Sequence, residues 1–222
     1  TSVKDIYSPI YHPDGNKMIV IKGHYDSDIG SMPLSQIKKA EIIQPDKNQR
    51  NQNKKLSVIE RSILSEDDAI LQPNGELIAY ASGRSGETQL WITKGKGSQQ
   101  LTHFPMDTYL NRMDWAADGE SLLVNANNVL TQVYLDSKQE TFPLEFPVVQ
   151  LFQWDSKNNS ALVLVRIKGL LKFVELNLTN SETRIINDKK VSWAQKSEDG
   201  KLIYKDKMNR YWQPGPAEDQ VI

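Results

Sequence analysis

The sequence predicts an all-β protein made of about five repeated four-stranded antiparallel units. Two observations carry this prediction. A tight turn, in most copies Asp-Gly or Asn-Gly, recurs along the 222 residues, and the same order of short apolar strands follows each copy. Asn-Gly between alternating apolar runs is the strongest short-range signal for a hairpin, because both turn positions favour a positive φ.

The second copy, residues 71–102, shows the whole unit. The turn at Asn74-Gly75 precedes an alternating strand that has Leu77, Ala79 and Ala81 on one face. A polar loop, a strand at 90–92, another glycine turn and a short closing strand at 100–102 follow. One such sheet is too small to bury both of its faces, so it needs neighbours of the same kind.

The turns end at Gly15, Gly75, Gly119, Asn159 and Gly200, which gives spacings of 60, 44, 40 and 41 residues. A repeat of about 40 to 45 residues that holds four strands is typical of a β-propeller blade. We therefore predict one β-propeller domain over residues 1–222, with approximate blades at 3–64, 65–108, 109–148, 149–189 and 190–222. Either five blades close by side-chain packing, or the chain is part of a longer propeller.

Tryptophans are expected to fill the space between neighbouring blades. Trp115 and Trp154 stand 39 residues apart at equivalent positions. A buried aromatic of this size contributes roughly 3 kcal/mol or more, judged by the cost of its truncation to Ala. Trp193 follows after another 39 residues but lies three positions earlier relative to its turn, which indicates either a bulge or a slip in the repeat alignment.

The first period is longer than the others because of a polar insertion near residues 37–55. A segment with so few apolar residues does not offset its own ordering entropy, so we expect a solvated loop. The alternative is that its basic residues contact phosphates or an acidic partner; these are Lys47, Arg50, Lys54 and Lys55.

Composition excludes several classes of protein. The net charge of −1 offers no field that would attract nucleic acid to the whole domain. The absence of cysteine excludes disulfides, thiolate metal sites and cysteine nucleophiles. No apolar run approaches 18 residues, so we expect a membrane to be reached only through parts of the parent protein outside this chain.

The repeat resembles the TolB-type (WD-like) bacterial propeller repeat. The second copy carries the resemblance best, with Pro73-Asn74-Gly75, the run Ser82-Gly-Arg-Ser-Gly86, Gln89-Leu-Trp91 and Gln100-Leu-Thr102. The fourth copy replaces the turn glycine with Asn159, and the third lacks the Arg-Gly loop. The resemblance spans nearly the whole chain and is specific for fold more than for function.

The resemblance implies three contexts. Such repeats occur in extracytoplasmic domains of membrane-anchored winged-helix regulators similar to CadC or ToxR, in the periplasmic TolB protein, and in propellers attached to serine peptidases. TolB proper has an additional α/β domain and a peptidase needs a Gly-x-Ser-x-Gly elbow, and this sequence resembles neither. We therefore expect a non-enzymatic sensory or protein-interaction domain of such a regulator, in the periplasm. A free-standing TolB-type scaffold and a peptidase-attached propeller are the alternatives.

The sequence contains no catalytic, cofactor-binding or metal-binding pattern. The segment His24-Tyr-Asp-Ser-Asp28 offers alternating polar residues, but one imidazole and two carboxylates do not make a closed ligand set. Gly95-Lys-Gly-Ser98 lacks the spacing and the helix of a phosphate loop. The acidic run Glu66-Asp67-Asp68 is interpreted as solvated.

Binding is expected at the funnel where the inner strands begin, on loops that join one blade to the next. The joins at 104–112 and 142–147 mix aromatic, Met and charged residues, a composition enriched in interfaces. Tyr109 and Arg112 are the preferred contacts, with Phe104 and Phe146 as further candidates whose alternative role is to cap blade edges. A protein or a small-molecule signal would bind there, and we expect no direct nucleic-acid binding.

Overall fold

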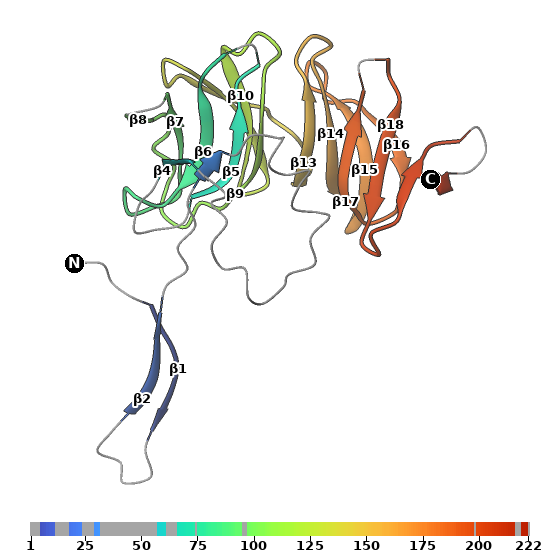
Figure 1. The fold of residues 1–222 in the computed structure, drawn as a ribbon. Coiled ribbons are helices and arrows are strands. Elements are labelled where there is room, and N and C mark those ends of the chain that lie inside the picture. The colour runs from blue at the N-terminus through green and yellow to red at the C-terminus, as the bar shows by residue number, and fades with distance from the viewer. Residues whose placement is uncertain are drawn as a thin grey trace, which may run out of the picture.

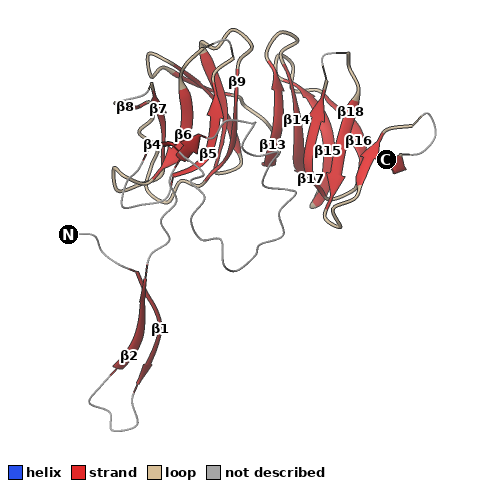
Figure 2. Ribbon diagram, in the orientation of Figure 1, coloured by secondary structure: helices blue, strands red, loops and turns tan. Residues whose placement is uncertain are grey.

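The computed structural model describes residues 5–11, 18–23, 29–31, 57–60, 66–73, 75–94, 97–197, 199–215 and 219–221. These residues form strands and loops, without a helix in the described part (Figure 2). The predicted all-β class is confirmed.

Four four-stranded antiparallel sheets follow one another in chain order, in a propeller arrangement (Figure 1). We number them as the second to fifth blades, after the repeats of the sequence. Their strands are β5 (Glu66–Leu71), β6 (Ile78–Ser82), β7 (Gln89–Thr93) and β8 (Ser98–Gln100); β9 (Leu110–Trp115), β10 (Ser121–Ala126), β11 (Val129–Tyr134) and β12 (Gln139–Thr141); β13 (Val148–Asp155), β14 (Ser160–Ile167), β15 (Leu170–Asn177) and β16 (Thr183–Asn187); β17 (Val191–Lys196), β18 (Leu202–Asp206), β19 (Tyr211–Gln213) and β20 (Gln220–Val221). The inner strands β5, β9, β13 and β17 contact one another in that order.

The region of the first copy differs from a complete blade. Strand β1 (Asp5–Tyr11) pairs with β2 (Met18–Gly23), and β3 (Ile29–Ser31) pairs with β4 (Ser57–Glu60), but the two pairs form separate sheets. The β1–β2 hairpin lies apart from the four blades (Figure 1). A repeat pattern locates strands but does not determine which strand edges pair. Gly15, His12, His24 and the predicted insertion at 37–55 lie outside the described residues.

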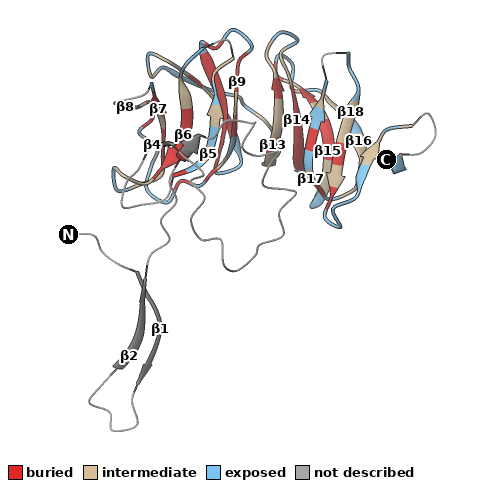
Figure 3. Ribbon diagram, in the orientation of Figure 1, coloured by how far each residue is buried: buried red, intermediate tan, exposed pale blue. Residues whose placement is uncertain are grey.

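Three apolar clusters lie between consecutive blades, where the buried strands gather (Figure 3). Trp115 packs with Ala79, Ala81 and Leu90 of the second blade. Trp154 packs with Leu123 and Leu130 of the third blade. Each tryptophan therefore fills the space between its own blade and the preceding one.

Trp193 lies on the other face of its blade. A register shift between Val191 and Trp193 marks a bulge in β17, and Trp193 forms an edge-to-face contact with Tyr211 in place of packing in the core. The residue four before the turn glycine, where Trp115 stands in the third blade, is Lys196 in the fifth. From Trp193 to Lys196 the strand pairs with β18 without interruption, and residues three apart in a regular strand face opposite sides. Trp193 is therefore not the counterpart of Trp115, and the irregular spacing is a slip in the repeat alignment.

The turn residues share one backbone conformation in three copies. Gly119, Asn159 and Gly200 have positive φ values of 76°, 48° and 85°. Asn is the residue after Gly that tolerates this left-handed region best, so the fourth copy keeps the turn without its glycine. The turn at Gly75 closes with the same hydrogen bond as that at Gly119, Gln72 N to Leu77 O and Ala116 N to Ser121 O, both at 2.8 Å. Gly75 itself does not have a positive φ, so the conformation expected for this Asn-Gly turn is wrong.

Candidate functional site

Loops at one end of the blades carry the candidate residues. In a four-stranded antiparallel blade, the loop between the second and third strands and the connection to the next blade leave from the same end. We call this the interblade end. In the described residues it comprises the loops at 83–88, 101–109, 127–128, 142–147, 168–169, 188–190 and 207–210.

Tyr109 and Met106 protrude from the connection between β8 and β9, with 68% and 74% of their surface exposed. The loop beneath them is anchored. Tyr109 N donates to Asn127 Oδ1 at 2.8 Å, and Asn127 N donates to Tyr109 O at 3.0 Å. Thr108 closes a turn through Oγ1 to Pro105 O at 2.7 Å. Two large side chains are thus presented to solvent on a loop held by hydrogen bonds.

Arg112 lies on the inner strand β9 and pairs with Asp68 on β5, with Nη1 and Oδ1 3.4 Å apart. Both residues have positive φ, 73° for Arg112 and 52° for Asp68, and both lie at bulges in their strands. A long side chain rarely adopts this conformation, and such strain gathers at functional sites. The pair bridges two blades and is partly exposed to solvent.

Phe104 and Phe146 are half-buried and lie on different clusters. Phe104 packs on the cluster between the second and third blades, and its backbone is held on both sides by Gln89. Phe146 packs on the cluster between the third and fourth blades, with Phe142. Beside Phe146 is a hollow of about 340 Å³, which Asn127 also lines. Asn127 therefore connects this hollow to the loop of Tyr109. Phe104 does not line the hollow and packs against the cluster between the second and third blades.

Sequence reasoning missed the role of the acidic run at 66–68, which begins the inner strand β5 of the second blade. Glu66 was predicted to be solvated but is buried, and its Oε1 accepts hydrogen bonds from Ser82 Oγ and Arg84 Nη2, both at 3.1 Å. The guanidinium of Arg84 also lies over the rings of Tyr80 and Trp91, at 5.2 and 5.1 Å. The partner of Glu66 stands 18 residues later in the chain, so only the paired strands bring them together.

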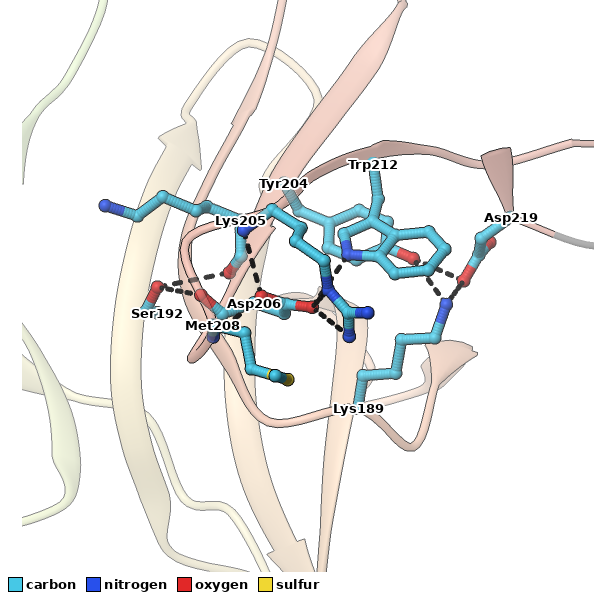
Figure 4. Close-up of polar contacts among 9 residues, drawn as sticks. Lys189, Ser192, Tyr204, Lys205, Asp206, Met208, Trp212 and Asp219 are labelled. Atoms are coloured by element: carbon cyan, nitrogen blue, oxygen red, sulfur yellow. Dashed lines mark hydrogen bonds and ion pairs between the residues drawn. The ribbon is translucent and has the colours of Figure 1, made fainter. Parts of the chain in front are cut away.

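The fifth blade holds a second polar network, which no motif in the sequence indicated (Figure 4). Lys189 Nζ lies 3.0 Å from Asp219 Oδ2 and 3.6 Å from the centre of the Trp212 ring. Tyr204 donates to the same carboxylate. Burial, together with the hydrogen bond and charge of Asp219, raises the pKa of Tyr204, so its hydroxyl stays protonated.

Asp206 anchors the β18–β19 hairpin in this network. Burial acts to raise the pKa of Asp206, but hydrogen bonds from Arg210 N, Trp212 Nε1, the Arg210 side chain and Met208 N outweigh it and lower the pKa to about 2. Asp114, between the third and fourth blades, shows the opposite balance. Burial raises its pKa although Trp154 N and Trp115 N donate to it, at 2.7 and 3.0 Å. These carboxylates have backbone or cationic partners that suit a structural role.

The arrangement is suited to binding. Within the described ranges no three His, Asp or Glu side chains gather so as to hold a metal ion. In the same ranges, no helix has the length and apolar character needed to span a membrane. What the interblade end of the second and third blades offers is an anchored loop with exposed Tyr109 and Met106 beside the Arg112–Asp68 pair.

Comparisons with known proteins show the fold. No protein-family model and no curated protein matches the sequence. Among solved structures, a putative TolB from Agrobacterium tumefaciens matches with a TM-score of 0.62 at 11% identity, covering 99% of this chain and 81% of that one. TolB from Acinetobacter baumannii matches with a TM-score of 0.58 at 13% identity, covering 100% of this chain and 57% of that one. A chain of the nidogen/laminin complex gives 0.64 at 10% identity, covering 88% of this chain and 74% of that one. The chain therefore has a TolB-like β-propeller fold.

Proposed function

We propose that this chain is a non-enzymatic protein-interaction domain that binds its partner with the interblade end of the second and third blades. The observation that carries this proposal is the pair of exposed side chains, Tyr109 and Met106, on a loop anchored by Asn127. Aromatic residues, Met and Arg are enriched in the buried centres of interfaces, where a few of them supply most of the affinity. An anchored loop also loses little conformational entropy when it binds.

Arg112 would add specificity to this surface. Its ion pair with Asp68 is partly solvated, so it can be exchanged for a carboxylate of the partner at small cost. The hollow beside Phe146, next to Asn127, is a second place where a partner side chain would fit. One structural neighbour comes from a protein complex, that of nidogen with laminin, which is in keeping with a binding role for the fold.

Within this role we propose the extracytoplasmic sensory domain of a membrane-anchored winged-helix regulator, whose DNA-binding part would lie outside this chain. The TolB-like repeats of the sequence and the TolB-like fold support an extracytoplasmic propeller. A free-standing periplasmic scaffold of TolB type is the second candidate, which the same fold supports. The two differ in the rest of the parent protein, a winged helix with a membrane segment in the first and an α/β domain in the second.

A crosslinking capture from detergent-solubilised envelope extract tests the interaction. The bait is the chain itself, compared with Tyr109→Ala/Arg112→Ala, after circular dichroism has confirmed that the variant folds. Tyr134→Ala/Arg184→Ala is the matched control, because it also removes one tyrosine and one ion-paired arginine, on strands β11 and β16 away from this site.

A protein captured by the wild type and the control but lost from the site variant would support the proposal. Capture that survives in the site variant would place the contact elsewhere and reject the site. If no protein is captured at all, the protein-interaction function is wrong, and a small-molecule signal becomes the better hypothesis.

A further inference from the structure

We propose that the interblade end of the fourth and fifth blades is a docking surface for an anionic phospholipid membrane. We call this surface the basic edge. It consists of five exposed cations and two exposed apolar side chains, namely Arg166, Lys168, Lys190, Lys207 and Arg210 with Leu170 and Met208. The proposal goes beyond protein binding by the second and third blades, and beyond the expectation that only other parts of the parent protein reach a membrane.

Contacts connect the three segments of the basic edge. Lys172 on β15 pairs with Asp188, at 2.7 Å, in the connection between β16 and β17. The next residue, Lys189, stacks on Trp212 of β19. Lys190 then lies close to Lys207 in the β18–β19 loop, and this second ammonium group lowers the pKa of Lys207. The hairpin loops of two neighbouring blades thus meet around the same connecting segment.

The positive charge of the basic edge is in excess. Its acids are already engaged, Asp188 by Lys172 and Asp206 by Arg210 at 2.8 Å. Arg166, Lys168, Lys190 and Lys207 have no ion pair with any described residue. Two ammonium groups placed together repel each other, and an anion between them would relieve that repulsion.

The excess is confined to these two blades. At the same end of the second and third blades the loops carry Glu87, Asp107 and Glu145, and the two arginines there, Arg84 and Arg112, pair with Glu66 and Asp68. The whole chain has a net charge of −1, so the basic edge is a local concentration of charge on a nearly neutral molecule. Such a concentration orients a protein toward an anionic surface.

Two exposed apolar residues at the hairpin ends favour a bilayer over an acidic protein. Leu170 and Met208 are 63% and 73% exposed and stand in the hairpins β14–β15 and β18–β19, next to the unpaired cations. Apolar side chains that enter the boundary between headgroups and acyl chains, flanked by lysines that contact phosphates, are the usual chemistry of interfacial binding. A rim of acidic side chains on a protein would use the cations and leave these two side chains in water.

Sedimentation with lipid vesicles tests the proposal. The 222-residue chain is mixed with vesicles of phosphatidylglycerol in phosphatidylcholine, or of phosphatidylcholine alone, and the bound fraction is measured. The charge variant is Lys190→Gln/Lys207→Gln, with Lys94→Gln/Lys157→Gln as control, since these two lysines are also exposed and lie at the opposite end of the blades. The apolar variant is Leu170→Ser/Met208→Ser, with Leu71→Ser/Ile185→Ser as control, because these two residues are 66% and 54% exposed and lie on strands β5 and β16, outside the loops of the interblade end.

We expect the wild type to bind only the anionic vesicles, with a partition coefficient that falls as salt rises. The charge variant should bind about tenfold or more weakly, and the apolar variant should lose a similar factor, whereas both controls should bind as the wild type does. The proposal is wrong if the wild type does not bind anionic vesicles, or if the controls lose as much as the variants. Binding that is lost in the charge variant but unchanged in the apolar variant would also overturn it, because Leu170 and Met208 are the residues that favour a bilayer over an acidic protein.

Discussion

The two interblade tryptophans differ in one hydrogen bond, and this predicts a difference in the cost of replacing them by Phe. Trp115 Nε1 donates across the blade boundary to Ile70 O at 3.3 Å. Trp154 Nε1 is buried and has no acceptor among the described residues. Both side chains are otherwise buried in the same way, each between its own blade and the preceding one.

The magnitudes follow from these contacts. Replacing Trp by Phe removes the same ring atoms at both positions, at about 1 kcal/mol of lost burial each. At Trp115 the substitution also removes a hydrogen bond worth about 1 kcal/mol. At Trp154 it removes a buried donor whose desolvation costs about 1–3 kcal/mol. We expect Trp115→Phe to destabilise the protein by about 2 kcal/mol and Trp154→Phe to be close to neutral.

Urea unfolding followed by circular dichroism measures both free energies of unfolding. For a slope of about 2–3 kcal/mol per molar urea, a difference of about 2 kcal/mol separates the two midpoints by about 0.7–1 M. Trp115→Ala and Trp154→Ala are the reference variants and should cost about 3–5 kcal/mol each. Equal costs for the two Phe variants, or a larger cost at Trp154, would refute the reasoning from the hydrogen bond.

Three further predictions concern single turns and ion pairs. The pKa of Asp206 is lowered to about 2 from 3.8, so its ionised form stabilises the fold above pH 3.8 and this contribution disappears as the pH falls toward about 2. Asp206→Asn should therefore lower the melting temperature at neutral pH and flatten its dependence on pH in that window; an unchanged acid dependence would contradict this. Gly119→Ala should destabilise by about 1 kcal/mol more than Gly200→Ala. Both have positive φ, but only at Gly119 would a Cβ come within 3.0 Å of Gln72, whose Nε2 donates to Gly119 O. Equal melting temperatures for the two variants would exclude the contact as the cause. Glu66→Ala should cost about 3 kcal/mol in urea unfolding, because it leaves the mostly buried Arg84 guanidinium without this carboxylate. A loss below about 1 kcal/mol would mean that the pair is not a buried one.

The repeat made the fold predictable. Alternation of apolar residues and the recurrence of turn residues are local signals, and each blade restates them about every 40 residues. The strands of the second to fifth copies, the positive φ of Gly119 and Gly200, and the all-β class follow from such signals. Even the replacement of the turn glycine by Asn159 keeps the backbone conformation that the position requires.

The candidate site was predictable only as a set of loops. Composition placed Tyr109 and Arg112 in a connection with the character of an interface. The anchoring by Asn127 and the partner of Arg112, Asp68, come from other strands. The basic edge could not be predicted from the sequence for the same reason. Its cations lie in three segments between residues 166 and 210, and these segments meet only when neighbouring blades pack.

The sequence by itself determined the repeat, the strands and most turns, since these depend on residues within a few positions of one another. Tertiary structure alone decided which strand edges pair, which face of β17 Trp193 occupies, and which charges are buried. Glu66 illustrates the reason. Its local sequence predicts a solvated carboxylate, and its charge is buried because Ser82 on β6 and Arg84 in the β6–β7 loop donate hydrogen bonds to it. Bulges act in the same way, because the extra residues that bring Asp68 and Arg112 together in β5 and β9 are set by the contacts of the assembled blades.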